Sequence, residues 1–349
     1  MNYHMISIFF IFAVVHNFLS PMKLIKITGF LALCLALFSS CSKDLNINDD
    51  WKEIMVVYGL LNPNDSVNYI KITKAFLGPG NALQYAQISD SSNLVAKLKV
   101  TLSEYNGTTL VNSFVLDTTM ISEKDSGLFY FPDQILYVYR GQLNRAHQYK
   151  LSVLDTVTGV EVTSSTYLVN DISIQEPSIF SKANFIPGAL STVKWYSAKY
   201  GKRYQLNIHF KYLEISGQDT AHKTVDWLVF SDIKSGTIEG DDNMESSFTG
   251  DGFYSAIRAQ VPYNASVIRI PDQVQYVFTV GTEELSNYIE VTNPSNTIVQ
   301  EKPVYTNIEN GIGLFTSRTD NTDNNVRLLD LSQRTLDSLK NGSITGDLF

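Results

Sequence analysis

The chain has 349 residues, a formal net charge of −8 at pH 7, and 44% hydrophobic and 12% aromatic residues. This length is sufficient for two domains of ordinary size. The acidic balance argues against nucleic acid and anionic lipid headgroups as partners, because both are bound by basic surfaces.

Residues 1–40 are predicted to be a signal peptide. Lys23 and Lys26 form a short basic region, and the apolar run that follows, residues 27–37, is too short to span a membrane. A separate apolar run in residues 1–21 has no Lys or Arg before it. We therefore expect translation to start at Met22.

The signal ends in Phe38-Ser-Ser-Cys41, which is typical of a lipoprotein cleavage box. Cys41 would become the first mature residue and the lipid anchor, because its thiol can accept a diacylglycerol. The alternative is an ordinary cysteine beyond a secretory cleavage site. The other cysteine, Cys34, lies inside the signal, so no intramolecular disulfide is expected.

A polar tether, residues 41–51, leads to a first predicted domain, residues 52–170. Seven to eight short β-rich runs separated by turn residues favour a β-sandwich there. Asn106-Gly107 predicts a hairpin turn with positive φ at both residues. Tyr149 opens an alternating strand six residues after Leu143, as in the tyrosine corner of immunoglobulin-like and fibronectin type III domains.

A second sandwich-like domain is predicted for residues 171–349. Its strongest signal is the alternation from Tyr204 to Tyr212, which places five large apolar side chains on one face. A short helix is predicted after Thr282, whose hydroxyl can cap it, and a second from about Ser332 to Lys340. The fold class is thus all-β, with two tandem β-sandwich domains and one or two short helices near the C-terminus.

The sequence indicates neither a catalytic nor a metal site. His147, His209 and His222 lack metal-ligand spacing, and nucleophile elbows and phosphate-binding loops are absent. Two acidic loops, residues 239–243 and 320–325, do not match a calcium-binding loop and are interpreted as solvated turns, with calcium as the alternative. No cofactor is expected.

Two segments carry apolar residues beside glycine. Phe76 and Leu77 precede Gly78-Pro79-Gly80, where a loop would be polar, and they are the candidate partner-contact residues; packing against the rim of the sandwich is the alternative. In the second segment, Gly311 and Gly313 bracket Ile312 and permit close backbone approach before a last strand.

The lipoprotein box, residues 55–65 (MVVYGLLNPND), residues 72–78 (ITKAFLG) and residues 306–315 (TNIENGIGLF) together resemble a family of outer-membrane lipoproteins of Bacteroidota. These proteins carry a domain of unknown function and are often encoded beside TonB-dependent receptors. The resemblance spans most of the mature chain. It implies an outer-membrane location, on either face, and a receptor protein as partner, and it carries over no catalytic residue.

We therefore expect a non-catalytic outer-membrane lipoprotein that acts as a binding or assembly module, accessory to a TonB-dependent transporter. Two alternatives stay open. One is a carbohydrate-active or proteolytic enzyme of the envelope whose carboxylates converge only in the folded chain. The other is a structural or adhesion protein of the cell surface.

Overall fold

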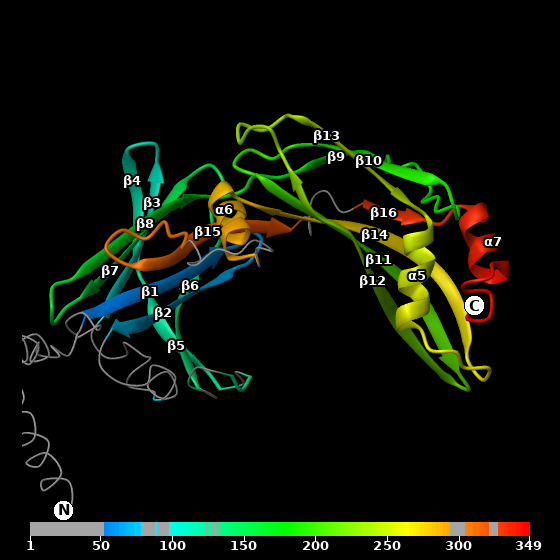
Figure 1. The fold of residues 1–349 in the computed structure, drawn as a ribbon, viewed down its shortest axis with the longest axis horizontal. Coiled ribbons are helices and arrows are strands. Elements are labelled where there is room, and N and C mark those ends of the chain that lie inside the picture. The colour runs from blue at the N-terminus through cyan, green and yellow to red at the C-terminus, as the bar shows by residue number, and fades with distance from the viewer. Residues whose placement is uncertain are drawn as a thin grey trace, which may run out of the picture. The chain divides into compact units, whose positions relative to one another are not determined.

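The structure is a computed structural model, which describes residues 52–77, 88, 98–122, 125–127, 130, 133–293, 304–320 and 327–349. The fold is mostly β, with 55% strand and 11% helix. The described residues form three sheets and three short helices (Figure 1). This agrees with the predicted all-β class.

The smallest β-sheet has three strands, in the order β13 (Asn243–Thr249), β10 (Leu190–Tyr196) and β9 (Ser173–Glu176). A second sheet has four antiparallel strands, in the order β4 (Thr109–Val115), β3 (Leu98–Asn106), β7 (Gln148–Asp155) and β8 (Glu161–Tyr167). The predicted β3–β4 hairpin is present, but its turn lies one residue later than expected. Asn106 is still paired with Thr109, and only Gly107 has positive φ, +60°.

The largest sheet has nine strands and combines strands from both halves of the chain. Its order is β12 (Asp219–Lys234), β11 (Arg203–Ser216), β14 (Ile268–Gly281), β15 (Ile312–Asp320), β1 (Lys52–Leu61), β2 (Val67–Leu77), β6 (Gln134–Arg140) and β5 (Asp117–Ile121). The ninth strand, β16 (Arg327–Asp330), pairs with β14. The predicted β1–β2 hairpin is confirmed by its antiparallel register.

Strand β15 pairs in parallel with β1, which lies about 250 residues earlier in the chain. Gly313 opposes Val57 in this pair and has a φ of +124°. A Cβ atom on Gly313 would lie 2.0 Å from the Val57 carbonyl oxygen. The close backbone approach expected around Ile312 is therefore present, and it serves strand pairing.

Three helices lie in the described part of the second half. They are α5 (Asp251–Gln260), α6 (Glu283–Thr292) and α7 (Gln333–Asn341). The Thr282 hydroxyl caps α6 as predicted, and the Ser332 hydroxyl caps α7. Helix α5 was not predicted, although it buries Phe253, Tyr254 and Ile257 on one face, which is a helical spacing.

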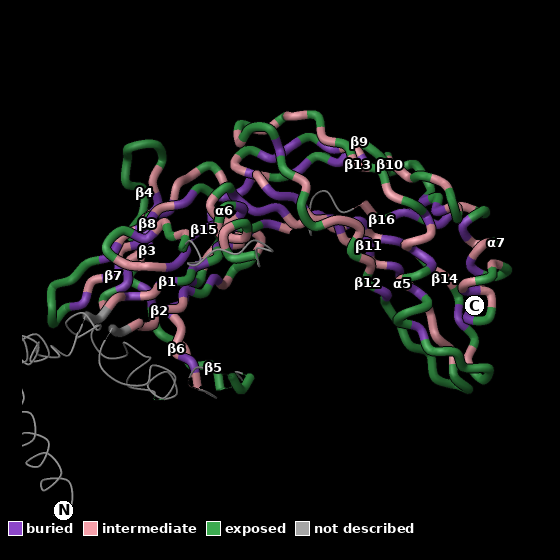
Figure 2. The backbone as a smooth tube through the Cα atoms, viewed as in Figure 1, coloured by how far each residue is buried: buried purple, intermediate pink, exposed green. Residues whose placement is uncertain are grey.

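Two hydrophobic clusters form the core (Figure 2). One gathers residues 169–348 and includes all five side chains of the alternating run in β11, from Tyr204 to Tyr212. The other joins the sheets of the first half, around Val57, Leu102 and Tyr149. Ile308 and Phe315 belong to this second cluster, so the stretch around β15 completes the core of the N-terminal strands.

The predicted tyrosine corner is present. The Asn144 amide donates a 2.8 Å hydrogen bond to the Tyr149 hydroxyl, which ties the loop to the start of β7. An equivalent corner, not predicted, opens β11: the Ala198 amide donates a 2.8 Å hydrogen bond to the Tyr204 hydroxyl. Each tyrosine lies five or six residues after the residue whose amide it binds. Each also stands at the start of a strand in which buried residues alternate with more exposed ones.

Candidate ligand-binding groove

A groove of about 650 Å³ lies against the outer face of the four-stranded sheet. Because side chains alternate along a strand, the inner face of β7 carries the buried Leu151 and Val153, and the outer face carries Lys150 and Ser152. Strand β8 repeats this pattern with Val162 inside. The floor of the groove is therefore the polar face of a sheet whose other face is core.

The strand register places the side chains of the floor in two rows across the strands. Ser103, Lys150 and Ser165 are directly opposite one another on β3, β7 and β8. In the next row, Ser152 opposes Thr163. All five residues line the groove, so it presents four hydroxyls around one ammonium group.

The Lys150 ammonium lies 4.4 Å from the centroid of the Tyr105 ring, which also lines the groove. This cation–π contact holds the long lysine side chain against the floor. Within the described residues, the Lys150 ammonium has no hydrogen-bond acceptor, so its three N–H groups are available to a ligand.

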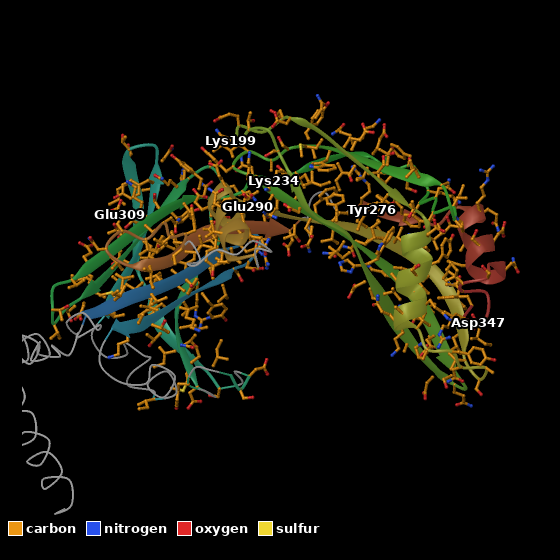
Figure 3. The ribbon with its side chains drawn as sticks, viewed as in Figure 1. Lys199, Lys234, Tyr276, Glu290, Glu309 and Asp347 are labelled. Carbon is orange, nitrogen blue, oxygen red and sulfur yellow. The ribbon has the colours of Figure 1, made fainter. Side chains whose placement is uncertain are left out.

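One wall of the groove is the segment that leads into β15. Asn307 fixes this segment, because its side chain accepts a 2.9 Å hydrogen bond from the Phe315 amide and donates a 2.7 Å bond to the Phe315 carbonyl oxygen. Ile308 is buried in the core. Glu309, labelled in Figure 3, exchanges backbone hydrogen bonds with Thr163 at the free edge of β8. The wall is thereby joined to the edge of β8 by a single β-bridge.

The end of the groove is formed by Glu284 of α6 and by Tyr305. Burial raises the pKa of the Tyr305 phenol, and the nearby charge of Glu284 raises it further, so the phenol stays protonated and can donate a hydrogen bond. Tyr305 is half-buried. The groove thus has a polar aromatic group at one end.

Helix α6 is held in place by buried and surface ion pairs. Arg203 of β11, with its side chain 8% exposed, contacts Glu290 at 3.3 Å and also pairs with Asp232. Lys234 pairs with Glu290, and its hydrogen bond lowers the pKa of that carboxyl (both labelled in Figure 3). These contacts fix the helix that carries Glu284.

Two hydroxyls of the floor already donate hydrogen bonds within the protein. Ser152 donates to Glu161 at 2.6 Å, and Thr163 donates to Glu309 at 2.9 Å. Each hydroxyl oxygen has two lone pairs, which remain as acceptors for a ligand. The groove therefore offers acceptors from these hydroxyls, donors from Lys150, and carboxylate acceptors at its wall and end.

The structure places the sequence-predicted residues as follows. Cys41 and residues 78–83 lie outside the described residues. The backbones of Phe76 and Leu77 form the end of β2, paired with Glu53 and Lys52, where the sequence suggested the start of a loop. Their role in partner contact remains a prediction.

His147 belongs to a buried polar cluster around Glu104, which is 7% exposed. The Glu104 carboxylate lies 2.7 Å from His147 Nδ1 and accepts hydrogen bonds from Tyr149 at 3.1 Å and Asn112 at 2.8 Å. Burial raises the pKa of Glu104, but the hydrogen bonds from Asn112, His147 and Tyr149 outweigh burial and lower it. His147 is thus a hydrogen-bonded structural histidine, as interpreted from sequence.

His209 pairs with Asp226 across β11 and β12. In the acidic loop at residues 239–243, Asp242 accepts hydrogen bonds from the Thr237 amide and hydroxyl, so it closes its own turn. In the described part of the chain, no cluster of three or more His, Cys, Asp or Glu residues is placed to hold a metal ion.

Among the helices of the described residues, none is both long enough and apolar enough to cross a bilayer. No family model matches the chain, and no curated protein matches it. Among solved structures, the chain is similar to the C-terminal globular domain of an oligosaccharyltransferase from Pyrococcus abyssi, at 10% identity and a TM-score of 0.22. The match covers 65% of this chain and 48% of that one, and a likeness this weak carries no argument.

Sequence reasoning did not find the groove. Its floor has a signal in Glu161-Val-Thr-Ser-Ser-Thr-Tyr167, a strand with hydroxyl residues on its outer positions. Its wall has no local signal, because residues 305–309 reach β8 only through the parallel pairing of β15 with β1.

Proposed function

We propose that this protein is a non-catalytic lipoprotein of the outer membrane that acts as a binding module, and that the groove on the outer face of β3, β7 and β8 is its binding site. The observation that carries the proposal is the groove itself: about 650 Å³, which falls in the range of about 300–1,000 Å³ typical of ligand sites. The polar groups of its floor converge from three strands.

We further propose the finer architecture as two tandem sandwiches of the immunoglobulin or fibronectin III kind. Two separate core clusters and a tyrosine corner in each half support this arrangement. In this scheme the first sandwich carries the groove, and the second supplies α6, β15 and the wall.

The partner in this proposal is an outer-membrane receptor of the TonB-dependent kind, and the contact includes Phe76 and Leu77. The support is the resemblance in sequence and the apolar character of these residues at the end of β2. The lipid on Cys41 would hold the module beside the receptor.

A second candidate function is hydrolysis in the groove. Glu284 and Glu309 both line it, and most glycoside hydrolases use a pair of carboxylate residues for catalysis. Glu309, however, is bound to Thr163 through its side chain and its backbone, which suits a wall residue better than an acid or nucleophile.

The anchor is tested by Cys41→Ala. This change removes the only thiol that the mature chain could acylate, and each buried CH₂ of an acyl chain contributes about 0.8 kcal/mol to membrane binding. We expect the variant to leave the membrane fraction and to lose labelling by radioactive palmitate. Persistent palmitate incorporation would contradict the anchor.

The partner contact is tested by replacing Phe76 and Leu77 together with serine. If they are contact residues, the melting temperature should change by no more than about 2 °C, because surface substitutions usually stay within about ±0.5 kcal/mol. Recovery of the receptor by affinity purification from solubilised outer membranes should fall. A large drop in melting temperature would instead assign both residues to the core.

A further inference from the structure

We infer that the ligand of the groove is a neutral oligosaccharide, bound along the outer face of β7 and β8. This inference rests on the proposed function of the groove as a binding site. It adds the chemical class of the ligand, which follows from the groups that line the groove and from those that are missing.

The groove offers both hydrogen-bond donors and hydrogen-bond acceptors. A saccharide presents hydroxyls that both donate and accept, about one per ring carbon, and needs a surface that does the same. The hydroxyls of Ser152 and Thr163 donate hydrogen bonds to Glu161 and Glu309, so toward a ligand they can only accept hydrogen bonds. The Lys150 ammonium can donate hydrogen bonds to a ligand. Ser165 accepts from Gln148 at 3.4 Å and keeps its own proton to donate.

The charges of the groove favour a neutral ligand. The groove contains one cation, Lys150, and two carboxylates, Glu284 and Glu309. An anionic ligand would meet two like charges and a protein of net charge −8, and a cationic ligand would meet the ammonium at the centre of the floor. A ligand without charge avoids both conflicts and still uses every charged group as a hydrogen-bond partner.

The groove is poorly suited to an extended peptide. Peptides commonly bind by adding a strand to a free sheet edge, with pockets for alternate side chains. At Thr163 the edge of β8 is already bridged by Glu309 through two backbone hydrogen bonds, which interrupts the edge that a peptide strand would need. The groove also lacks an apolar pocket: its one aliphatic lining residue, Leu151, is 2% exposed and points into the core.

The test is isothermal titration of the full mature protein in detergent. The neutral probes are maltohexaose, cellohexaose, xylohexaose and mannohexaose. The comparison probes are hexagalacturonate, which is anionic, and a six-residue Gly-Ser peptide. We expect one or more neutral probes to bind and neither comparison probe to do so.

Two groove variants test whether the neutral probe binds in the groove. Ser165→Tyr fills the groove, and Lys150→Ala removes its central donor; each should raise the dissociation constant for the neutral probe at least tenfold. The matched controls are Thr220→Tyr and Lys223→Ala on β12, both exposed and away from the groove, which should leave it unchanged. Circular dichroism should show the same β signal for all four variants.

The outcomes distinguish a wrong ligand class from a wrong binding site. Binding of the peptide that Ser165→Tyr abolishes would overturn the saccharide class, and binding of hexagalacturonate that Ser165→Tyr abolishes would overturn the neutrality of the ligand; either result would keep the groove as the site. Neutral binding that the groove variants leave intact would overturn the groove, and the proposed function with it. Absence of binding by all four neutral probes would overturn the saccharide inference.

Discussion

Replacing Gly313 with valine is expected to lower the free energy of unfolding by about 3 kcal/mol or more, a large part of the 5–15 kcal/mol typical of a domain. Gly313 has a φ of +124°, a backbone conformation that residues other than glycine rarely adopt. A side chain there would also enter the space of the Val57 carbonyl group, 2.0 Å away. Backbone cannot move aside as a flexible side chain would.

Replacing Gly313 should also disturb the groove. Separation of β15 from β1 would withdraw Phe315 from the core and release Asn307, which is bound to the Phe315 backbone. We therefore expect both a lower melting temperature and a loss of ligand binding. Gly236→Ala is the control, because a Cβ there meets only Asp242 at an ordinary 3.7 Å. Equal melting temperatures for the two variants would contradict the assigned role of Gly313.

Replacing Glu104 with alanine is expected to lower the free energy of unfolding by about 2–4 kcal/mol, because each buried group left without its hydrogen-bond partner costs about 1–3 kcal/mol. Three groups donate to or contact this carboxylate: Asn112, His147 and Tyr149. Without it, the buried Tyr149 hydroxyl and the largely buried His147 Nδ1 lose their acceptor, whereas the exposed Asn112 amide can turn to water. Chemical denaturation at pH 7 measures the loss, and Tyr149→Phe, which removes one hydroxyl only, should cost less.

The same cluster predicts a pH dependence. Its hydrogen bonds lower the pKa of Glu104 below the unfolded value of about 4.3. A carboxyl with a lowered pKa contributes stability that is complete above the unfolded pKa and is lost as the pH falls through the folded pKa. Between about pH 6 and pH 3, the wild type should therefore lose more stability than Glu104→Gln. Parallel pH profiles for the two proteins would show that Glu104 makes no such contribution.

The sequence was sufficient where the signal is local. Thr282 and Ser332 mark helix starts because a capping hydroxyl must directly precede the helix. The alternation from Tyr204 to Tyr212 marks a strand with one buried face, and all five of its apolar residues are buried. In each case the interaction joins residues a few positions apart.

The sequence was insufficient where the signal is distant or ambiguous. The pairing of Val57 with Gly313 joins strands about 250 residues apart, and no local pattern specifies the partner. Helix α5 was missed because Gly250 at its N-cap provides no capping side chain and because the helix lies between β-rich runs. The groove combines floor residues from three strands with a wall from a fourth segment, so it exists only after these pairings are made.

The most direct test of the binding-module account is site-specific photo-crosslinking in intact outer membranes. Benzoylphenylalanine replaces Tyr305, an aromatic residue that lines the groove, and, as a control, Thr220 on β12 of the second half. We predict an adduct at position 305 that excess maltohexaose or another binding neutral probe suppresses, and no such adduct at position 220. Equal labelling at the two positions, or labelling at position 305 that the bound probe does not suppress, would contradict the groove as the binding site.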